Sequence, residues 1–206
     1  MEEIKHDDLY SAFRTALEMA DDRGYFVSKE LQDISTEAFK DNYNRFKLEN
    51  GFVLLLTKPE SEEKLLVYFA RYERAISGED IKRFATKMGE ERVFCGVIIS
   101  NKDLSPSADK LIRDINTESS FKIEHFLVQN LLVNITHHEL VPKHMIASEE
   151  EKKAVLKKYR VKESQLPKIL VNDPVAKYLG VRRGQLVKII RDSETAGKHV
   201  VYRIAV

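Results

Sequence analysis

A short charged turn is the first place where this sequence could do chemistry. Glu62 and Lys64 form a Glu-x-Lys pattern directly before the apolar run at residues 65–70. Metal-dependent nucleases use this pattern, together with an upstream aspartate, to hold Mg²⁺ and orient a water molecule. The nearest upstream aspartate is Asp41, in a segment predicted to be helical. Because charged triplets are also typical of plain surface turns, we favour a surface turn and keep a metal-dependent nuclease as an alternative.

A cluster of possible metal ligands lies in the C-terminal third of the chain. It consists of His137, His138, Glu139 and His144. Zinc requires three or four ligands that converge on one point at about 2 Å. Neighbouring side chains of an extended segment point to opposite sides, so His137 and His138 would not easily reach one ion. We therefore interpret these histidines as structural or interface residues, and we expect no metal and no cofactor.

The two parts of the chain carry opposite net charge. Residues 134–206 contain 15 Lys and Arg against 8 Asp and Glu, a net charge of +7. Residues 1–133 contain 19 Lys and Arg against 25 Asp and Glu, a net charge of −6. This asymmetry predicts two domains, 1–133 and 134–206, that face different partners.

The basic residues of the second domain leave three interpretations open. They could form a solvated face, a face buried against a partner protein, or a contact with nucleic acid, and charge alone does not choose between them. Along the predicted strand 184–191, Lys188 alternates with the inward Val187 and Ile189, so we expect its side chain to point outward. The basic residues are Lys177, Arg182, Arg183, Lys188, Arg191, Lys198 and Arg203.

Length and composition fit one large or two small folded domains. The chain has 206 residues, of which 43% are hydrophobic and 33% are charged. Its longest apolar stretches, 52–56 and 65–70, are too short to cross a membrane, so we expect no membrane partner. The acidic, polar N-terminus is not typical of a signal peptide. The single cysteine, Cys95, lies in an apolar run, where we expect it to be a small buried hydrophobe.

Helices and strands alternate in the first domain, which predicts a mixed α/β sheet of about four strands. We expect helices over 7–23 and 35–46, the latter with Ala38, Phe39, Tyr43 and Phe46 inward. Ser77 and Asp80 form a capping-box pattern that starts a helix running to Gly89, and Ser105-Pro106 starts another that runs through Ile115. Strands are expected at 52–57, 64–70, 92–99 and 121–128.

The second domain is predicted to be a small α+β unit. Ser148 and Glu151 form a capping box that starts a helix, whose inward face is Val155, Leu156 and Tyr159. Asp173-Pro174 starts a short helix that stops at Gly180. Two strands, 184–191 and 199–206, form a hairpin.

Several segments, taken together, resemble one known family. The segments NITHHELVPKH (134–144), YRVKESQLPKI (159–169), DPVAKYLG (173–180) and GQLVKIIRDSETAG (184–197), with the terminal YRIAV, are similar to the assembly domain of the fifth-largest subunit shared by the three eukaryotic nuclear RNA polymerases. That domain corresponds to a small subunit of the archaeal RNA polymerase. The segments at 9–27 and 104–111 resemble the N-terminal domain of the same eukaryotic subunit, with Ser105 at the threonine position of a Thr-Pro-Ser-Ala turn.

The resemblance implies a jaw domain followed by an assembly domain. In that family the first domain, whose fold resembles restriction endonucleases without their activity, forms part of the lower jaw near downstream double-stranded DNA. Because phosphate neutralisation drives affinity for DNA, a domain of charge −6 would only guide a duplex that is held elsewhere. The residues expected to contact DNA lie in and around the Ser105 turn. They are Lys102, Ser105, Pro106, Ser107, Ala108 and Lys110.

The second domain is expected to dock on the largest subunit. The resemblance thus implies a non-catalytic common subunit of RNA polymerases I, II and III, bound to the other subunits and working in transcription in the nucleus. The alternative is a free-standing nucleic-acid-binding protein, suggested by the basic second domain. The residues expected at the assembly interface are His138, Glu139, Lys177, Tyr178, Arg182, Arg183, Lys188, Arg191, Tyr202 and Arg203.

Overall fold

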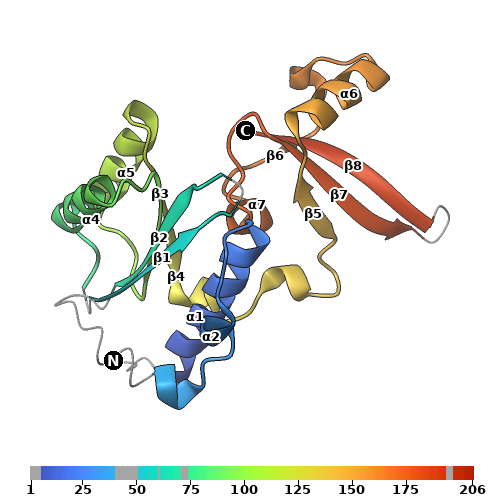
Figure 1. The fold of residues 1–206 in the computed structure, drawn as a ribbon. Coiled ribbons are helices and arrows are strands. Elements are labelled where there is room, and N and C mark those ends of the chain that lie inside the picture. The colour runs from blue at the N-terminus through green and yellow to red at the C-terminus, as the bar shows by residue number, and fades with distance from the viewer. Residues whose placement is uncertain (1–5, 40–50, 60, 71–73, 194–196) are drawn as a thin grey trace. The chain divides into compact units, whose positions relative to one another are not determined.

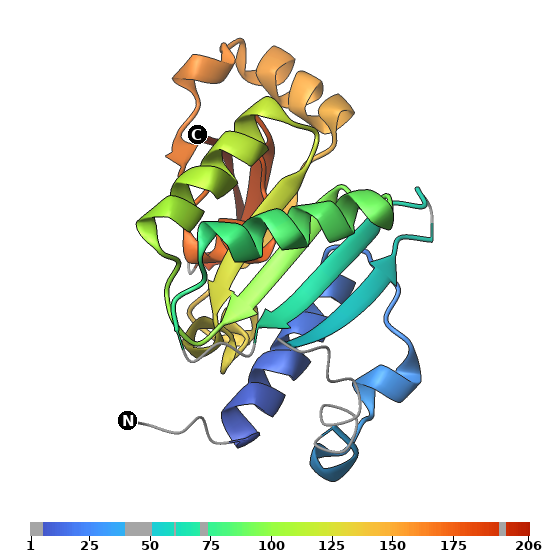
Figure 2. The same ribbon diagram turned by 90° about the vertical axis from the view of Figure 1, so that its left-hand side faces the viewer.

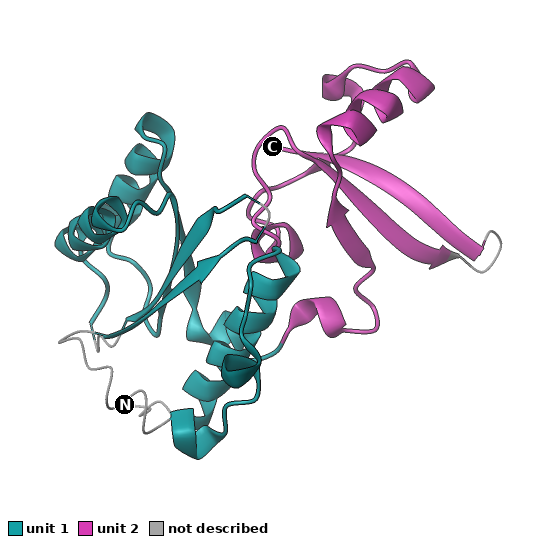
Figure 3. Cartoon of the chain, viewed as in Figure 1, with its two compact units in different colours: residues 1–133 teal, residues 134–206 magenta. Residues whose placement is uncertain are grey.

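Two compact units make up the chain in a computed structural model, which describes residues 6–39, 51–59, 61–70, 74–193 and 197–206. The units are Met1–Val133 and Asn134–Val206 (Figure 3). This division coincides with the change in the sign of the net charge. No helix in the described ranges is long and apolar enough to cross a membrane.

The first unit is a four-stranded sheet with helices on both faces (Figures 1 and 2). The strand order is β1-β2-β3-β4, with β1 and β2 antiparallel and the other neighbours parallel. Helices α4 and α5 cover one face, and α1 lies against the other. The strands are β1 (Gly51–Thr57), β2 (Lys64–Ala70), β3 (Cys95–Ser100) and β4 (Lys122–Leu127), and the helices are α1 (His6–Asp22), α2 (Lys29–Gln32), α4 (Gly78–Glu90), α5 (Pro106–Glu118) and the 3₁₀ turn η1 (Val128–Leu131).

Helix α1 covers its face of the sheet through a cluster of phenylalanines. Phe13 lies with its ring centroid 4.6 Å from that of Phe39, 6.0 Å from Phe52 and 5.9 Å from Phe69. Phe39 was expected on the inward face of the helix 35–46, and it is buried within the helical residues 36–39. Tyr43 and Phe46 lie outside the described residues.

Helices α4 and α5 pack on the opposite face through Ile81, Phe84 and Ile112, which surround Leu66 and Ile98 of the sheet. The contact between α4 and β3 is close because β3 carries a glycine. A Cβ atom added to Gly96 would lie 2.7 Å from both the Met88 Sδ and the Phe84 Cε1 atoms. The absence of a side chain at Gly96 therefore lets α4 lie directly on the sheet.

The second unit is a four-stranded sheet of order β5-β7-β8-β6 with one α-helix against each face. Val187 and Ile189 pack with α7, whereas Leu186 and Ile204 pack with α6. Both units thus mix helices and strands, which confirms the predicted fold class. The elements are η2 (Ile135–His137), β5 (Lys143–Ile146), α6 (Glu149–Tyr159), η3 (Glu163–Gln165), β6 (Lys168–Ile169), α7 (Pro174–Tyr178), β7 (Leu186–Ser193) and β8 (Gly197–Ala205).

Helix α6 departs from the predicted pattern at its end. Ser148 caps it as expected, since its Oγ atom accepts a hydrogen bond from the Glu151 amide at 3.1 Å. Val155 is buried, but Tyr159, which was expected to face inward, is 54% exposed. Tyr159 is the last residue of α6 and its ring lies beside Lys158, with the Nζ atom 5.5 Å from the ring centroid. The helix therefore uses fewer inward positions than its periodicity predicted.

Candidate functional site

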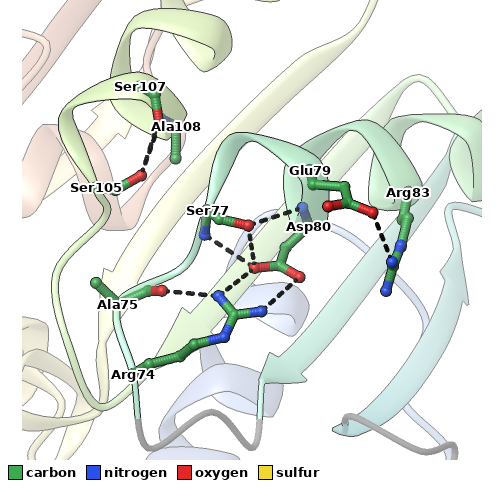
Figure 4. A network of polar contacts seen from close by, with 9 residues as sticks. All are labelled: Arg74, Ala75, Ser77, Glu79, Asp80, Arg83, Ser105, Ser107 and Ala108. Carbon is green, nitrogen blue, oxygen red and sulfur yellow. Dashed lines mark hydrogen bonds and ion pairs between the residues drawn. The ribbon is translucent and has the colours of Figure 1, made fainter.

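The starts of α4 and α5 lie side by side at one edge of the first sheet (Figure 4). They follow β2 and β3, which are parallel neighbours, so both helices begin at the carboxyl edge of the sheet. Ile76 and Leu104 form a parallel bridge there, and the Ser105 amide donates to the Ile76 carbonyl at 2.9 Å. A Cβ atom added to Gly78 would lie 3.7 Å from the Ser107 Oγ atom. Segments 74–78 and 104–107 are therefore in contact, and the name helix-start edge is used below for residues 74–80 and 102–110 around them.

The Ser105 turn satisfies most of its own amides. The Ser105 Oγ atom accepts from the Ala108 amide at 3.3 Å, and the Ser105 carbonyl accepts from the Asp109 amide at 3.0 Å. Pro106 has no N–H group. Within the described residues, the Ser107 amide is thus the one N–H group of this first turn without an acceptor. A phosphate would find fewer free amides here than a helix N-terminus usually offers.

One of the predicted DNA contacts needs correction. Ala108 has no exposed surface and packs in the core between α4, α5 and the sheet, so its side chain cannot touch DNA. It matters instead because it seats the first turn of α5. Pro106, Ser107, Lys102 and Lys110 are exposed, and Ser105 is half-buried.

An ion pair between a half-exposed arginine and a buried aspartate fixes the start of α4. Asp80 accepts hydrogen bonds from the Ser77 amide at 2.9 Å and the Ser77 Oγ atom at 2.7 Å, and its own amide donates to Ser77 Oγ at 3.4 Å. The Arg74 guanidinium binds both carboxylate oxygens of Asp80, at 2.8 and 3.1 Å, and also donates to the Ala75 carbonyl at 3.1 Å. Figure 4 shows this network beside the Ser105 turn. The predicted capping box is therefore confirmed, with an arginine added that the sequence pattern did not indicate.

The charges of the helix-start edge are largely paired. Three of its carboxylates each hold an arginine, whereas Lys102 and Lys110 are exposed and form no ion pair with any described residue. Asp103, next to Lys102, is likewise exposed. The paired carboxylates are Asp80 with Arg74 at 2.8 Å, Glu79 with Arg83 at 2.7 Å and Asp109 with Arg113 at 2.9 Å.

A buried serine anchors the backbone beside Lys102. The Ser100 Oγ atom lies 2.7 Å from the Lys102 carbonyl and 2.7 Å from the His125 Nε2 atom. Because the hydroxyl has one hydrogen, donation to the Lys102 carbonyl makes His125 Nε2 the donor to Ser100. Lys102 thus extends from a fixed backbone. No sequence pattern distinguished Ser100 or His125.

The Glu62 and Lys64 pattern lies in a hairpin turn between β1 and β2. The Glu62 amide donates to the Lys58 carbonyl at 3.1 Å, and the Lys58 amide donates to the Glu63 carbonyl at 2.8 Å. Glu62 is exposed with a positive φ of 56°. Asp41, the third member of the pattern, lies outside the described residues. Among the residues that are described, no three His, Cys, Asp or Glu side chains come together as metal ligands.

The predicted histidine cluster is spread over separate local structures. His137 ends the turn η2, His138 accepts from the Leu140 amide through Nδ1 at 3.2 Å, and His144 on β5 donates from Nδ1 to the Pro142 carbonyl at 2.7 Å. His138 and Glu139 are exposed. The structural or interface roles that we favoured over a metal site stay a prediction.

Tyr178 also needs correction as a predicted interface residue. Its side chain is 3% exposed, and its Oη atom accepts a hydrogen bond from the Asn134 Nδ2 atom at 2.9 Å. Asn134 is buried as well, and its Oδ1 atom accepts from the amide and hydroxyl of Thr136 at 3.0 and 2.6 Å. Tyr178 therefore fastens α7 to the start of the second unit. Asn134 was missed, although asparagine is typical of turns in which its side chain binds the backbone two residues further on.

The basic pair Arg182 and Arg183 lies on a braced turn. The Arg182 amide donates to the Gln185 Oε1 atom at 2.7 Å, and the Gly184 amide donates to the Ala205 carbonyl at 2.9 Å. Lys152 on α6 donates from Nζ to the Gly184 carbonyl at 2.8 Å. Both arginine side chains are exposed. The turn therefore presents two cationic groups on a backbone that these hydrogen bonds hold in place.

Lys188 is not the outward-pointing residue that the strand pattern predicted. It does lie on the opposite face from Val187 and Ile189, but α6 covers that face. Its Nζ atom donates to the Glu151 Oε1 atom at 2.8 Å, and the Tyr202 hydroxyl donates to the same oxygen at 3.2 Å. Lys188 and Tyr202 thus hold α6 on the sheet. Their main role in this structure is to stabilise the second unit.

This network shifts the pKa values of its three members. The hydrogen bond from Lys188 lowers the pKa of Glu151 below its ordinary value, and the same bond raises the pKa of Lys188. Burial is the main cause that raises the pKa of Tyr202, followed by its hydrogen bond to Glu151. All three shifts favour the ionised Glu151 bound by a protonated lysine and a neutral phenol.

The predicted interface arginines of β7 and β8 lie on the opposite face of the sheet from Lys188. In the strand register, Arg203 is opposite Val187 and Arg191 is opposite His199, so both arginines share the face that α7 covers. Both are exposed, and Lys177 is half-buried on α7 itself. The exposed arginines among the predicted interface residues are Arg182, Arg183, Arg191 and Arg203, and they are called the basic set below.

Comparisons with known proteins identify the family across both units. Residues 3–88 match RNA polymerase Rpb5, N-terminal domain, and residues 133–205 match RNA polymerase Rpb5, C-terminal domain. The chain is 37% identical over 211 residues to the proteins named DNA-directed RNA polymerases I, II, and III subunit RPABC1 of Caenorhabditis briggsae and Caenorhabditis elegans, which covers 100% of this chain and 99% of each relative. It is 35% identical over 206 residues to the equally named protein of Dictyostelium discoideum, which covers 100% of both. The resemblance found in the sequence is thereby confirmed, and the chain belongs to the RNA polymerase Rpb5 family.

Proposed function

We propose that this chain is a non-catalytic subunit shared by the nuclear RNA polymerases I, II and III and that it works in transcription. The observation that carries the proposal is the similarity over the whole chain to relatives that bear the name of such a subunit. The nucleus is the proposed location, since these polymerases act there. The polar groups of the first unit also support a structural role, because they form caps and ion pairs that stabilise helices.

The second unit is proposed to dock on the largest subunit through the basic set. Interfaces of permanent complexes use exposed arginines more than lysines, because the planar guanidinium binds carboxylates with two hydrogen bonds. The braced turn supports this role, since a fixed backbone lowers the entropy lost on docking. A net charge of +7 in residues 134–206 calls for an acidic surface on the partner.

The first unit is proposed to lie in the lower jaw, with the helix-start edge toward downstream duplex DNA. Lys102, Lys110 and the Ser107 hydroxyl are the exposed groups that suit phosphate oxygens. Such contacts position the duplex without reading its sequence. They are expected to be weak, at about 1 kcal/mol or less each, because they are exposed and screened by salt.

Co-purification with the largest subunit tests the docking proposal. The variant Arg182→Glu, Arg183→Glu reverses two charges on the braced turn and should reduce recovery of the largest subunit by about tenfold or more. Lys188→Glu is unsuitable for this test, because it would break the network under α6. The matched control is Lys153→Glu, Lys157→Glu, which makes the same charge change at exposed positions of α6. Equal recovery with both variants would contradict the proposed docking surface.

Size-exclusion chromatography of native extract separates this function from the alternatives. A polymerase subunit should elute with a very large complex, whereas a free-standing nucleic-acid-binding protein should elute near its own mass of 23.8 kDa. A nuclease should cleave DNA when Mg²⁺ is added, and we expect the purified chain to show no such cleavage. Elution at the mass of the free chain would refute the subunit proposal.

A further inference from the structure

A lysine of α6 lies almost buried behind the basic turn of the second unit. The Lys152 side chain is 11% exposed, and its Nζ atom donates to the Gly184 carbonyl at 2.8 Å and pairs with the Glu163 Oε1 atom at 2.9 Å. An ammonium group at such a place needs partners of this kind, because its burial without them would cost free energy. Lys152 therefore joins three segments that are separate in the sequence, namely α6, the turn η3 and the turn 181–185.

Gly184 is the residue of this turn that most needs a support. Its φ of +82° lies in the left-handed region, and glycine has more conformational freedom than any other residue. The Gly184 amide donates to the Ala205 carbonyl at 2.9 Å and its carbonyl accepts from Lys152, so the peptide groups on both sides of Gly184 are held. Arg182 and Arg183 come directly before Gly184 and are exposed. The bond from Lys152 thus limits the movement of the backbone that carries both arginines.

We propose that Lys152 is a positioning residue for docking, which holds the backbone of Arg182 and Arg183 in the conformation that binds the largest subunit. This inference rests on the proposed function of the second unit. Lys152 is too buried to offer its own charge to a partner, so its effect on docking passes through the turn. A backbone that is already ordered loses less entropy when its arginines bind acidic groups of the partner.

Glu163 is the second part of the same support. Its side chain is 51% exposed, so water screens its pair with Lys152, and the pair by itself adds little stability. Its role is to keep the Lys152 ammonium beside the Gly184 carbonyl. Loss of Glu163 should therefore weaken docking less than loss of Lys152, and loss of both should equal loss of Lys152 alone.

The test compares full-length variants for recovery of the largest subunit from native extract. Lys152→Met keeps a side chain of similar length without the donor, and it should lower recovery about two- to tenfold, as expected when one or two more side chains must be ordered on docking. Lys152→Arg keeps the charge and the donors, so it should restore most of the recovery. Glu163→Gln should fall between Lys152→Met and the wild type, and adding it to Lys152→Met should change nothing further. Lys153→Met removes the same charge at the exposed neighbouring position of α6 and should have no effect.

Amide hydrogen exchange measures whether the loss arises in the turn. In Lys152→Met the Gly184 amide should exchange about two- to tenfold faster, as expected for the loss of one hydrogen bond. The Val171 amide, which donates to the Val206 carbonyl away from the turn, should exchange as in the wild type. Val155→Ala weakens the buried contact of α6 without removing a bond to the turn, so it should lower the melting temperature and leave recovery unchanged.

The combined results distinguish failure of this inference from failure of the proposed docking surface. If Lys152→Met recovers the wild-type amount while Arg182→Glu, Arg183→Glu does not, the inference is wrong and the docking surface stands. If neither variant lowers recovery, both are wrong. A loss for Val155→Ala as large as that for Lys152→Met would mean that stability alone governs recovery, and a loss for Lys152→Met without faster exchange at Gly184 would mean that the turn is not involved. Either result would overturn the positioning role.

Discussion

Removal of the Asp80 carboxylate is the perturbation that most sharply probes the helix-start edge. In Asp80→Ala, helix α4 loses the capping box in which Ser77 and Asp80 bind each other's amides. Loss of a cap costs about 1 kcal/mol. The Ser77 amide and hydroxyl lose a buried charged acceptor, which adds about 1–1.5 kcal/mol. The two bonds from Arg74 add little, because that side chain is 56% exposed and water replaces them. The expected cost is therefore about 2–2.5 kcal/mol.

Urea unfolding followed by far-UV circular dichroism measures this cost, since the chain has no tryptophan for fluorescence. The transition of the first unit should move to lower urea with an unchanged slope. Glu79→Ala is the matched control, because Glu79 is the neighbouring acid of the same turn and its pair with Arg83 is exposed. That control should cost about 0.5 kcal/mol or less. A cost for Asp80→Ala no larger than that of Glu79→Ala would refute the reasoning.

Two further predictions concern acid stability and backbone space. Glu151 has a lowered pKa in the folded chain, so its contribution to the stability of the fold is present above pH 4.5 and is lost as the pH falls through the folded-state pKa. The melting temperature of Glu151→Gln should therefore fall less between neutral and acidic pH than that of the wild type. An equal fall in melting temperature for both proteins would count against the network with Lys188. Gly51→Ala should cost about 3 kcal/mol, because its Cβ atom would lie 2.2 Å from the Phe69 carbonyl oxygen and the paired strands would have to separate. In Gly184→Ala the added Cβ atom meets no atom within 4 Å, and the φ of +82° is the only strain, so the substitution should cost only about 1–2 kcal/mol. A larger loss of stability for Gly184→Ala than for Gly51→Ala in denaturant unfolding would contradict this account.

The elements with strong local signals were predictable from the sequence. The capping box at Ser77 and the Ser105-Pro106 start placed α4 and α5 at their observed first turns. The runs 52–57 and 64–70 became β1 and β2 with nearly the same bounds. Strands β5 and β6 were missed because they are short, at four and two residues, and form only by pairing with neighbouring strands. Lys143–Ile146 pairs with β7, and Lys168–Ile169 pairs with β8, so no local pattern announces either strand.

At the candidate sites, sequence patterns placed residues on a strand or turn but did not predict what covers their side chains. Alternation along β7 indicated correctly that Lys188 lies opposite Val187, but it could not show that α6 covers that face. A motif match identified the positions of Ala108 and Tyr178 without showing that both side chains are buried. Arg74 was missed because its link to Asp80 spans six residues and follows no helical or strand repeat. Such contacts depend on tertiary structure, which a local pattern does not encode.

Site-specific photo-crosslinking in a stalled elongation complex tests the central claim most directly. A photoreactive residue replaces Ser107 in one sample and Arg183 in another, both at exposed positions. The account predicts crosslinks from position 107 to DNA ahead of the active centre on any template, and from position 183 to the largest subunit. Crosslinks from position 107 to protein alone, together with none from position 183 to the largest subunit, would contradict it.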